Sequence, residues 1–316
     1  MTNSNKPLIV ICGPTATGKT EYALKLAKER NGEVVSADSR QVYKYLDIGT
    51  GKDLSQGSSY EDYSVKLGIK EKNYSVGYYS VNNIPLWLYD ILKPDQRFSA
   101  AEYARIARLV IQDIWSRGKV PIVVGGTGFY IRALVDGVET EGVPPNLPLR
   151  KKLETKSVEE LRDIFKSLNG SKLNAMNQSD RQNPRRLIRA VEVEEHNKLQ
   201  PQTISQNQIK IITGNVHFIG LTLTREELYD RIDMRVEKRV QQGIVEEIKS
   251  LLIMGYGWNS PGLQTIGYKE WKPYFEKKET RDEVIQKWKL HEHSYARRQI
   301  TWFKKDSRIQ WTKPNT

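Results

Sequence analysis

The chain of 316 residues is long enough for one large domain, or for one domain with a sizeable insertion. A single cysteine excludes a disulfide framework, no stretch approaches the roughly 20 apolar residues of a membrane span, and the N-terminus lacks an apolar signal core, so we expect a cytoplasmic protein. The net charge of +12 fits either a solvated basic surface or a polyanionic partner, and 7 tryptophans and 16 tyrosines, which can stack on bases, favour a nucleic acid.

The first predicted element is a buried strand, Leu8–Cys12, whose apolar run leads into a glycine-rich loop. The loop matches G-x-x-x-x-G-K-[ST] and consists of Gly13, Pro14, Thr15, Ala16, Thr17, Gly18, Lys19 and Thr20. Its glycines let backbone N–H groups turn toward anionic oxygens, and the helix expected over 22–27 presents its positive end to the same anion. Lys19 supplies a mobile cation, and the Thr20 hydroxyl suits a magnesium ion that bridges phosphates. The sequence therefore predicts a diphosphate or triphosphate site.

A second strand is expected over 33–38 and ends in the carboxylate of Asp38. We expect a short helix over 39–46, a glycine-rich loop over 47–52, an irregular or hairpin-like excursion over 53–83 and a third strand over 86–90. Ligands of doubly wound sheets bind outside the carboxyl ends of the strands, where the phosphate loop also lies. Asp38 is therefore either the cap of the helix that follows it, or a general base or magnesium partner.

Strands and helices continue to alternate up to residue 134. Ser99 and Glu102 have the spacing of a capping box for a helix that extends to about 117. An apolar strand over 120–124 then leads through Gly125-Gly126-Thr127 into another helix. This alternation predicts an α/β fold with a P-loop-containing parallel sheet and helices on both faces. Thr127 is either a turn residue or a hydroxyl that reaches the substrate.

The character of the chain changes after Gly137. Prolines punctuate a linker, and the following residues are charged and helical, with a second capping box at Ser157 and a helix that starts at Asn183-Pro184. A strand is expected again over 216–221. We therefore predict a catalytic core formed by residues 1–140 and 206–316, interrupted by a helical insertion over 141–205.

The last part of the chain is predominantly helical. Thr224 has capping-box spacing to Glu227 and begins a long helix expected to continue to 252, and a final helix is expected to end at 305. Arg231 and Arg235 are four residues apart and therefore lie on one face of the long helix. They belong either to a solvated face or to a second cationic clamp on a diphosphate.

Several motifs occur in a fixed order between residues 8 and 305. They are the phosphate loop, Ser36-Ala37-Asp38-Ser39-Arg40-Gln41-Val42-Tyr43-Lys44, Asp47-Ile48-Gly49-Thr50-Gly51-Lys52, Val124-Gly125-Gly126-Thr127-Gly128-Phe129-Tyr130, Arg185-Arg186-Leu187-Ile188-Arg189-Ala190-Val191-Glu192-Val193, Ile266-Gly267-Tyr268-Lys269-Glu270 and Arg298-Gln299-Ile300-Thr301-Trp302. As an ordered set they resemble the tRNA dimethylallyltransferases, also called tRNA isopentenyltransferases.

The resemblance implies transfer of a dimethylallyl group from dimethylallyl diphosphate to the exocyclic amine of the adenine on the 3′ side of a tRNA anticodon. Asp38 would be the general base on that amine, Thr20 would hold Mg²⁺, and Lys19 would bind the diphosphate together with the rest of the loop. Thr127 would bond near the reacting centre, and Arg235 would grip the phosphates from the other side. The target base must leave its stack to react, and the helical insertion would contact the anticodon stem-loop.

The resemblance also implies a tRNA path along the protein. Its residues would be Asp38, Ser39, Arg40, Gln41, Thr127, Arg150, Arg185, Arg186, Leu187, Ile188, Arg189, Gln264, Thr265, Ile266, Gly267, Tyr268 and Lys269. The chain departs from the family pattern at Gly51, where relatives usually have alanine, and at Leu86-Trp87, where they usually have two histidines, and its segment 53–83 is longer. We expect tRNA and dimethylallyl diphosphate as partners, no obligate protein partner and a monomer.

A small-molecule or nucleotide kinase is the alternative function. It would share the phosphate loop and the sheet, and the arginine-bearing insertion could serve as its lid. An RNA-binding protein without catalysis would not need Thr20 or Asp38. A GTPase is disfavoured because the sequence contains no Asn-Lys-x-Asp motif that would read the base.

Overall fold

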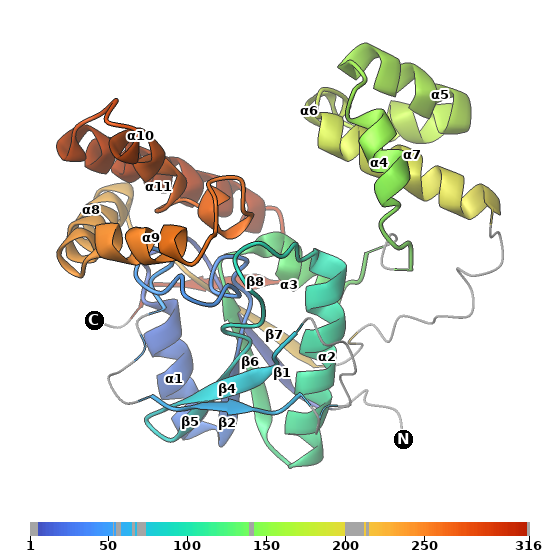
Figure 1. Ribbon diagram of the computed structural model, residues 1–316. Coiled ribbons are helices and arrows are strands. Elements are labelled where there is room, and N and C mark those ends of the chain that lie inside the picture. Colours follow the sequence, from blue (N-terminus) through green and yellow to red (C-terminus); the bar gives the residue numbers. More distant parts are fainter. Residues whose placement is uncertain are drawn as a thin grey trace. The chain divides into compact units, whose positions relative to one another are not determined.

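The computed structural model describes residues 6–52, 54, 58–64, 67, 74–138, 142–199, 212 and 215–314, and the chain divides into two compact units. Unit 1 comprises Met1–Asp136 and Ile211–Thr316, and unit 2 comprises Gly137–Lys210 (Figure 1). The ends predicted for the insertion, 141 and 205, lie outside the described residues. In the described part of the chain, none of the helices combines the length and the apolar character that crossing a bilayer requires.

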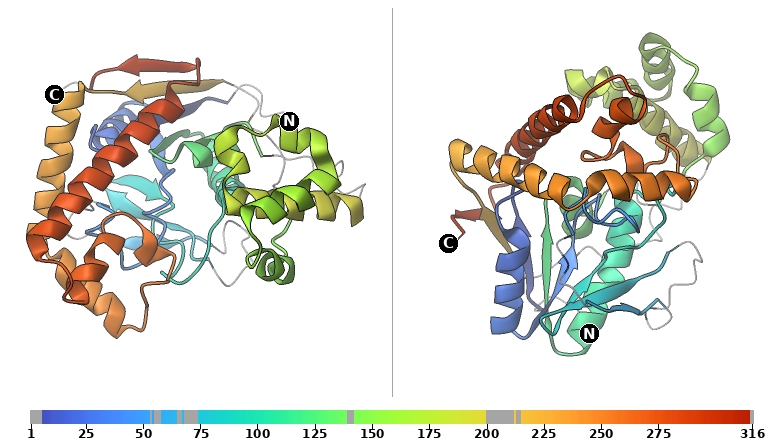
Figure 2. Two further views of the ribbon diagram at one scale, coloured as in Figure 1. Left: turned by 90° about the horizontal axis from the view of Figure 1, so that it is seen from above. Right: turned by 60° about the vertical axis from the view of Figure 1, so that its left-hand side comes forward.

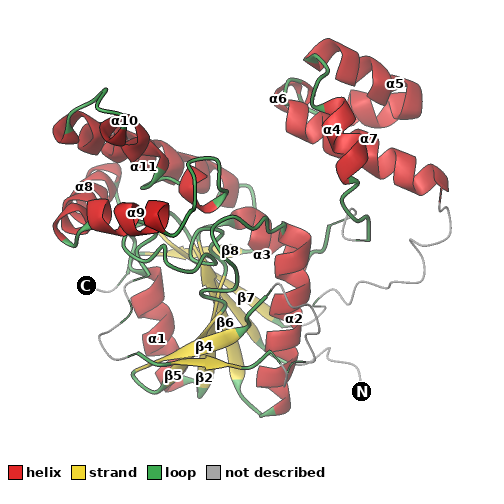
Figure 3. Ribbon diagram, in the orientation of Figure 1, coloured by secondary structure: helices red, strands yellow, loops and turns green. Residues whose placement is uncertain are grey.

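The described strands of unit 1 form one eight-stranded sheet in the order β3-β4-β5-β2-β6-β1-β7-β8. The strands are β1 (Leu8–Cys12), β2 (Gly32–Ser36), β3 (Tyr60–Asp62), β4 (Gly77–Val81), β5 (Ile84–Trp87), β6 (Val120–Gly125), β7 (Val216–Leu221) and β8 (Ile309–Thr312). From β5 to β8 in this order the strands run parallel, whereas β3 and β4 add an antiparallel edge (Figure 3). The sheet is therefore mixed rather than purely parallel, and its last strand, β8, was not predicted.

Helices cover both faces of this sheet. α1 (Lys19–Glu29) lies on one face, and α2 (Ala100–Ser116) with α3 (Gly128–Val135) lies on the other (Figure 1). The other helices of unit 1 are α8 (Arg225–Gln241), α9 (Ile244–Ile253), α10 (Lys272–Phe275) and α11 (Arg281–Phe303), with 3₁₀ turns at Gly262–Gln264 and Lys269–Trp271. Figure 2 shows these helices over the end of the sheet at which the loop after β1 lies.

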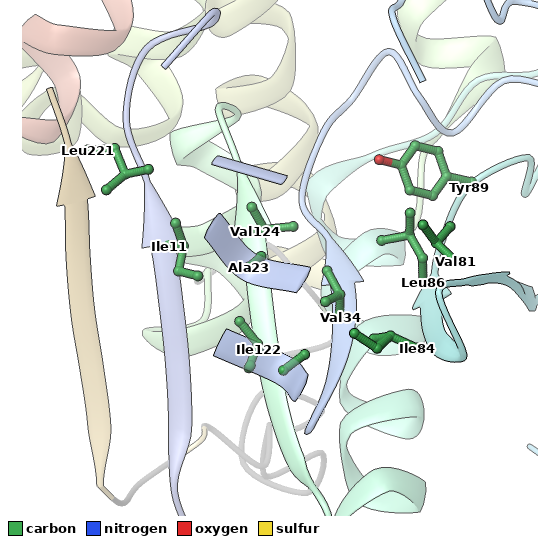
Figure 4. Close-up of a cluster of buried hydrophobic side chains, with 11 residues drawn as sticks. Ile11, Ala23, Val34, Val81, Ile84, Leu86, Tyr89, Ile122, Val124 and Leu221 are labelled. Atoms are coloured by element: carbon green, nitrogen blue, oxygen red, sulfur yellow. The ribbon is translucent and has the colours of Figure 1, made fainter. Parts of the chain in front are cut away.

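The buried cluster beneath α1 follows from the alternation of side chains along the strands. Ile122 and Val124 are two residues apart, so they lie on one face of β6, and both join a cluster with Ile11 of β1 and Val34 of β2 (Figure 4). Ala23 of α1 packs on the same cluster and is fully buried. This packing holds the start of α1 against the ends of the central strands.

The predicted capping boxes at Ser99 and Thr224 are confirmed, because in each case the side chain and the backbone three residues later exchange hydrogen bonds. The prediction of one helix continuing to 252 was wrong. α8 ends at Gln241, and α9 begins after Gly243, whose φ of 96° lies in the left-handed region and breaks the helix.

The short helix predicted over 39–46 was also wrong, because this segment pairs with residues of a neighbouring stretch instead. The backbone N–H of Lys44 donates to the carbonyl of Leu92 at 2.9 Å, and the N–H of Leu92 donates to the carbonyl of Val42 at 3.1 Å. Tyr45 has a φ of 68°, which no right-handed helix contains. The third strand ends at Trp87 rather than at 90.

The hairpin-like character expected within 53–83 is confirmed where the structure describes it. β4 and β5 pair antiparallel across a turn in which Asn82 and Asn83 have φ of 51° and 62°. Residues 53, 55–57, 65–66 and 68–73 lie outside the described part of the chain.

Unit 2 is helical in its described part, and its capping box at Ser157 is confirmed. Its helices are α4 (Leu147–Leu153), α5 (Val158–Ala175), α6 (Gln178–Arg181) and α7 (Pro184–Leu199). Apolar side chains from α4, α5 and α7, among them Leu161, Phe165 and Leu187, form its own buried cluster. α5 is kinked at Asn169.

Candidate functional site

The loop between β1 and α1 leaves the start of the helix open to a ligand. Gly13 has a φ of 136°, and a Cβ there would lie 2.4 Å from the carbonyl oxygen of Leu221, so only glycine fits against β7. Gly18 occupies the N-cap of α1 with a φ of 77°, and no side chain caps the helix. The first N–H groups of α1 are therefore available to an anion.

Lys19 folds back over this loop. Its Nζ donates to the carbonyl of Pro14 at 2.5 Å, and the hydroxyl of Thr17 donates to the same carbonyl at 2.9 Å. Burial lowers the pKa of Lys19 from its ordinary 10.5 to about 8, and the positive charge of Arg235 adds to the decrease. An anion bound beside these two cations would restore the charged form of the lysine.

Arg235 on α8 joins the phosphate loop to a second loop. Its Nη1 donates to the hydroxyl of Thr15 at 3.0 Å, and its Nη2 donates to the carbonyl of Gly51 at 3.1 Å. The guanidinium therefore lies across the phosphate loop from Lys19. Arg231 and Arg239, one turn before and after it on α8, line the same cavity.

Asp38 lies two residues beyond the end of β2 and does not cap a helix, because no helix follows it. Its Oδ1 accepts a hydrogen bond from the backbone N–H of Arg40 at 2.8 Å, which fixes the carboxylate in a local turn. The helix-cap alternative is therefore wrong. The carboxylate lines the cavity next to the phosphate loop.

Thr127 connects the end of β6 to the segment that carries Asp38. Its Oγ1 accepts from the backbone N–H of Ser39 at 3.0 Å and donates to the Ser39 hydroxyl at 3.2 Å. Thr127 also occupies the N-cap position of α3, but its side chain does not cap that helix. The hydroxyl thus lies one residue from Asp38, at the end of the neighbouring strand.

One cavity of about 750 Å³ in unit 1 brings most of these groups together. The predicted site residues that line it are Thr15, Ala16, Gly18, Lys19, Thr20, Asp38, Arg40, Gln41 and Arg235. Its charged lining is mostly positive, which suits a ligand with several negative charges. An open helix N-terminus, two opposed cations and a carboxylate in one cavity can bind a diphosphate and accept a proton nearby.

α11 supplies a wall of the site that the sequence reasoning missed. Glu292 accepts from Arg40 Nη1 at 3.1 Å, the Arg40 guanidinium lies 4.0 Å from the centre of the Tyr295 ring, and Gln299 bonds to the phosphate loop. Burial alone raises the pKa of Glu292, but Arg40 and Arg239 lower it below its ordinary value. The signal was present, because these α11 residues follow a helical spacing and are polar yet buried.

The stretch Gln264–Lys269 does not line the cavity. Ile266 and Tyr268 are buried, and the Tyr268 hydroxyl donates to Glu247 at 2.6 Å. Gln264 and Lys269 are exposed, so they are the members of this stretch that retain free surface. A side-chain contact with RNA is not available to Tyr268, which packs against the 47–52 loop.

The predicted RNA-binding arginines lie in unit 2 and fall into two groups. Arg150 and Arg189 both donate to Glu192, whose side chain is 1% exposed, so they compensate a buried charge. Arg185 is exposed, and Arg186 is 55% exposed although it pairs with Asp180. Leu187 and Ile188 belong to the apolar cluster of unit 2, so their side chains cannot contact RNA directly. Only Arg185 and Arg186 combine charge with an exposed position.

The described residues contain no group of three or more acidic, histidine or cysteine side chains that would hold a metal by themselves. Thr20 and Asp38 nevertheless place two hard oxygen ligands on one cavity. Mg²⁺ commonly takes one or two protein oxygens and completes its shell with phosphate oxygens and water. The residues present therefore fit a magnesium ion that arrives with a phosphorylated ligand.

Family models match almost the whole chain. The model described as IPP transferase matches residues 41–306, and the one described as isopentenyl transferase matches residues 6–59. The tRNA dimethylallyltransferase of Acetivibrio thermocellus is 37% identical over 307 residues, covering 96% of this chain and 90% of the relative. That of Alkaliphilus oremlandii is 38% identical over 307 residues, covering 97% and 91%.

Solved structures agree with these matches. The full-length tRNA isopentenylpyrophosphate transferase of Bacillus halodurans matches with a TM-score of 0.66 and 32% identity, covering 98% of this chain and 90% of that one. A eukaryotic dimethylallyltransferase crystallised in snapshots of its action on tRNA matches with a TM-score of 0.71, covering 98% and 74%. At 23% identity this second similarity supports the fold alone.

Proposed function

The chain belongs to the IPP transferase family of tRNA dimethylallyltransferases and is a tRNA-modifying prenyltransferase, and from this premise we propose how its residues divide the reaction. The relatives favour prenyl transfer over the kinase alternative, since the matching proteins carry the names of tRNA prenyltransferases. The observation that carries the proposal is the single cavity that contains Lys19, Asp38 and Arg235.

Dimethylallyl diphosphate binds with its phosphates at the open N-terminus of α1. Lys19 and Arg235 contact them from opposite sides, and the guanidinium exchanges its bond to Thr15 for phosphate oxygens or adds to it. The bond between C1 of the dimethylallyl group and the bridging oxygen breaks with its electron pair going to the diphosphate. The two cations stabilise the charge that develops on this leaving group.

A magnesium ion would be held by the Thr20 hydroxyl together with the diphosphate and water. When bound, it neutralises negative charge on the diphosphate oxygens and makes diphosphate a better leaving group. Thr20 follows Lys19 in the first turn of α1, so its hydroxyl lies on the same cavity as the lysine.

Asp38 accepts the proton that the substrate amine must lose. The adenine amine forms a bond to C1 of the dimethylallyl group, becomes positively charged, and transfers a proton to the carboxylate. The bond from Arg40 N–H to Oδ1 keeps this carboxylate oriented, and Thr127 bonds beside it through Ser39. The acceptor is the adenine on the 3′ side of the anticodon, extruded from its stack to enter the cavity.

Unit 2 binds the tRNA at a distance from the chemistry. The exposed arginines Arg185 and Arg186 begin α7 and suit phosphates of the anticodon stem-loop, whereas Arg150 and Arg189 maintain the fold of the unit through Glu192. The protein acts as a monomer in the cytoplasm. Neither proposal requires a second protein chain.

The direct test is an assay with purified protein, dimethylallyl diphosphate, Mg²⁺ and tRNA transcribed without modifications. We expect prenylated adenosine at the position 3′ of the anticodon, detected by nucleoside mass spectrometry after digestion, and release of one diphosphate for each nucleoside formed. Replacing dimethylallyl diphosphate by ATP is the control. Turnover of ATP without formation of prenylated adenosine would overturn the proposal in favour of a kinase.

A further inference from the structure

The loop over 47–52 is built around a buried lysine. The side chain of Lys52 is 1% exposed, and its Nζ donates to the carbonyl of Tyr43 at 2.8 Å, to Asp47 Oδ1 at 2.5 Å and to Asp90 Oδ1. The other oxygen of Asp90 accepts from the hydroxyl of Tyr79 at 2.5 Å. Removing a charge from water is costly, so a buried lysine with this many partners fixes the path of the chain around it.

A second charged group holds the same loop from α9. The carboxylate of Glu247 accepts from the backbone N–H groups of Asp47, Ile48 and Gly49 at 2.9, 2.8 and 3.3 Å. It also accepts from the hydroxyl of Tyr268 at 2.6 Å. Three consecutive backbone donors on one carboxylate leave this part of the loop little freedom.

The product of this arrangement is the position of one carbonyl. The oxygen of Gly51, adjacent to Lys52, accepts from Arg235 Nη2 at 3.1 Å and from Gln41 Nε2 at 3.2 Å. The contact is tight, because a Cβ on Gly51 would lie 2.3 Å from Arg235 Nη2. The loop therefore determines where the Arg235 guanidinium lies relative to Thr15 of the phosphate loop.

We propose that Lys52 and Glu247 are positioning residues that act through the Gly51 carbonyl to hold Arg235 in place for the diphosphate. Neither side chain lines the cavity, so neither touches the substrate. The inference rests on the proposed role of Arg235. A long arginine side chain loses rotamer freedom when it binds a phosphate, and a fixed carbonyl acceptor removes part of that freedom before the ligand arrives.

The test is a pair of double-mutant cycles in the full chain. Lys52→Met and Glu247→Gln are each made alone and together with Arg235→Ala, and the readouts are the Kd of dimethylallyl diphosphate with Mg²⁺ and the single-turnover rate of prenyl transfer to tRNA. Each single variant is expected to weaken binding about tenfold, and Lys52→Arg to recover part of the loss. In the Arg235→Ala background neither change should have a further effect. Glu246→Gln, next to Glu247 on α9 but 70% exposed, is the matched control and should leave both readouts unchanged.

The outcomes separate this inference from the function on which it rests. Losses that multiply in the double variants would show that Lys52 and Glu247 act independently of Arg235, and would overturn the inference alone. An Arg235→Ala variant with normal binding and transfer would remove the clamp itself, and the inference with it. Circular dichroism and thermal unfolding establish that each variant is folded, and if Lys52→Met is not, Glu247→Gln carries the same cycle.

Discussion

The side-chain Oε1 of Gln299 accepts a hydrogen bond from the backbone N–H of Thr15 at 2.9 Å, joining the last helix of the chain to the phosphate loop. The Nε2 of the same side chain donates to the carbonyl of Gly126 at 2.9 Å. One buried amide thus connects the loop after β1 to the turn after β6, which carries Thr127. The two loops that meet the diphosphate and the reacting centre are held together from α11.

Gln299→Leu is expected to loosen this connection while preserving the volume of the side chain. The variant leaves a buried donor and a buried acceptor without partners, so the free energy of unfolding should fall by about 1–3 kcal/mol. The KM for dimethylallyl diphosphate should rise as the phosphate loop gains freedom. Urea unfolding and steady-state kinetics measure the two effects, and Gln286→Leu, an exposed position on α11, is the control. A normal KM would show that the loop does not depend on Gln299.

Asp38→Asn tests the assignment of the base. Asparagine keeps an acceptor oxygen for the Arg40 N–H, so the local turn should persist, but it cannot take a proton. We expect the single-turnover rate of prenyl transfer to fall by about 10²-fold or more, with the Kd of dimethylallyl diphosphate nearly unchanged. Rapid-quench kinetics and calorimetry provide the two values. Turnover close to that of the unaltered protein would exclude Asp38 as the base.

The depressed pKa of Lys19 predicts how diphosphate binding depends on pH. The free protein loses the charge of Lys19 as pH rises through about 8, whereas the phosphates are already ionised there because their last pKa lies near about 6. The affinity for dimethylallyl diphosphate should therefore be greatest below pH 8 and should decline above it. Calorimetric titrations between about pH 7 and pH 9.5 measure this decline.

Lys19→Arg provides the comparison for this pH profile. A guanidinium remains charged throughout the range, so the affinity of the variant should vary less with pH, whatever its absolute value. Equal slopes for the two proteins would assign the pH dependence to another group. The same shift also predicts a stability effect. Since the unfolded chain binds a proton at Lys19 between pH 8 and 10.5 that the folded chain lacks, this residue's contribution to stability rises with pH across that window.

Arg185→Ala and Arg186→Ala test whether α7 contacts the tRNA backbone. Each phosphate contact that is lost releases fewer counterions on binding, so affinity should fall and the slope of log Kd against log salt should become shallower by about 1 per contact. Filter binding or fluorescence anisotropy at several salt concentrations gives both quantities. Arg281→Ala, an exposed arginine at the start of α11, is the control. An unchanged salt slope would place these arginines away from the RNA.

Where the sequence reasoning failed, the cause was a contact with a distant part of the chain. The segment 39–46 has a composition compatible with a helix, but it pairs with Leu92 instead. Arg150 and Arg189 read as free cations, yet both are committed to Glu192. Spacing within a segment contains no record of such partners, which lie tens of residues away.

The sequence alone determined the features that neighbouring residues decide among themselves. Strand β1 with its glycine loop, the capping boxes at Ser99 and Thr224, and the ordered motifs of the family all depend on hydrogen bonds or patterns that span a few residues. Only the tertiary structure decided which of the charged groups meet. Arg235 reaches Thr15 across 220 positions of the chain, and Gln299 reaches it across 284, because the sheet brings the ends of its parallel strands, and the helices over them, to one place. Should the cavity that contains Lys19 and Asp38 fail to bind a prenyl diphosphate, the chemistry assigned to this convergence would have no site.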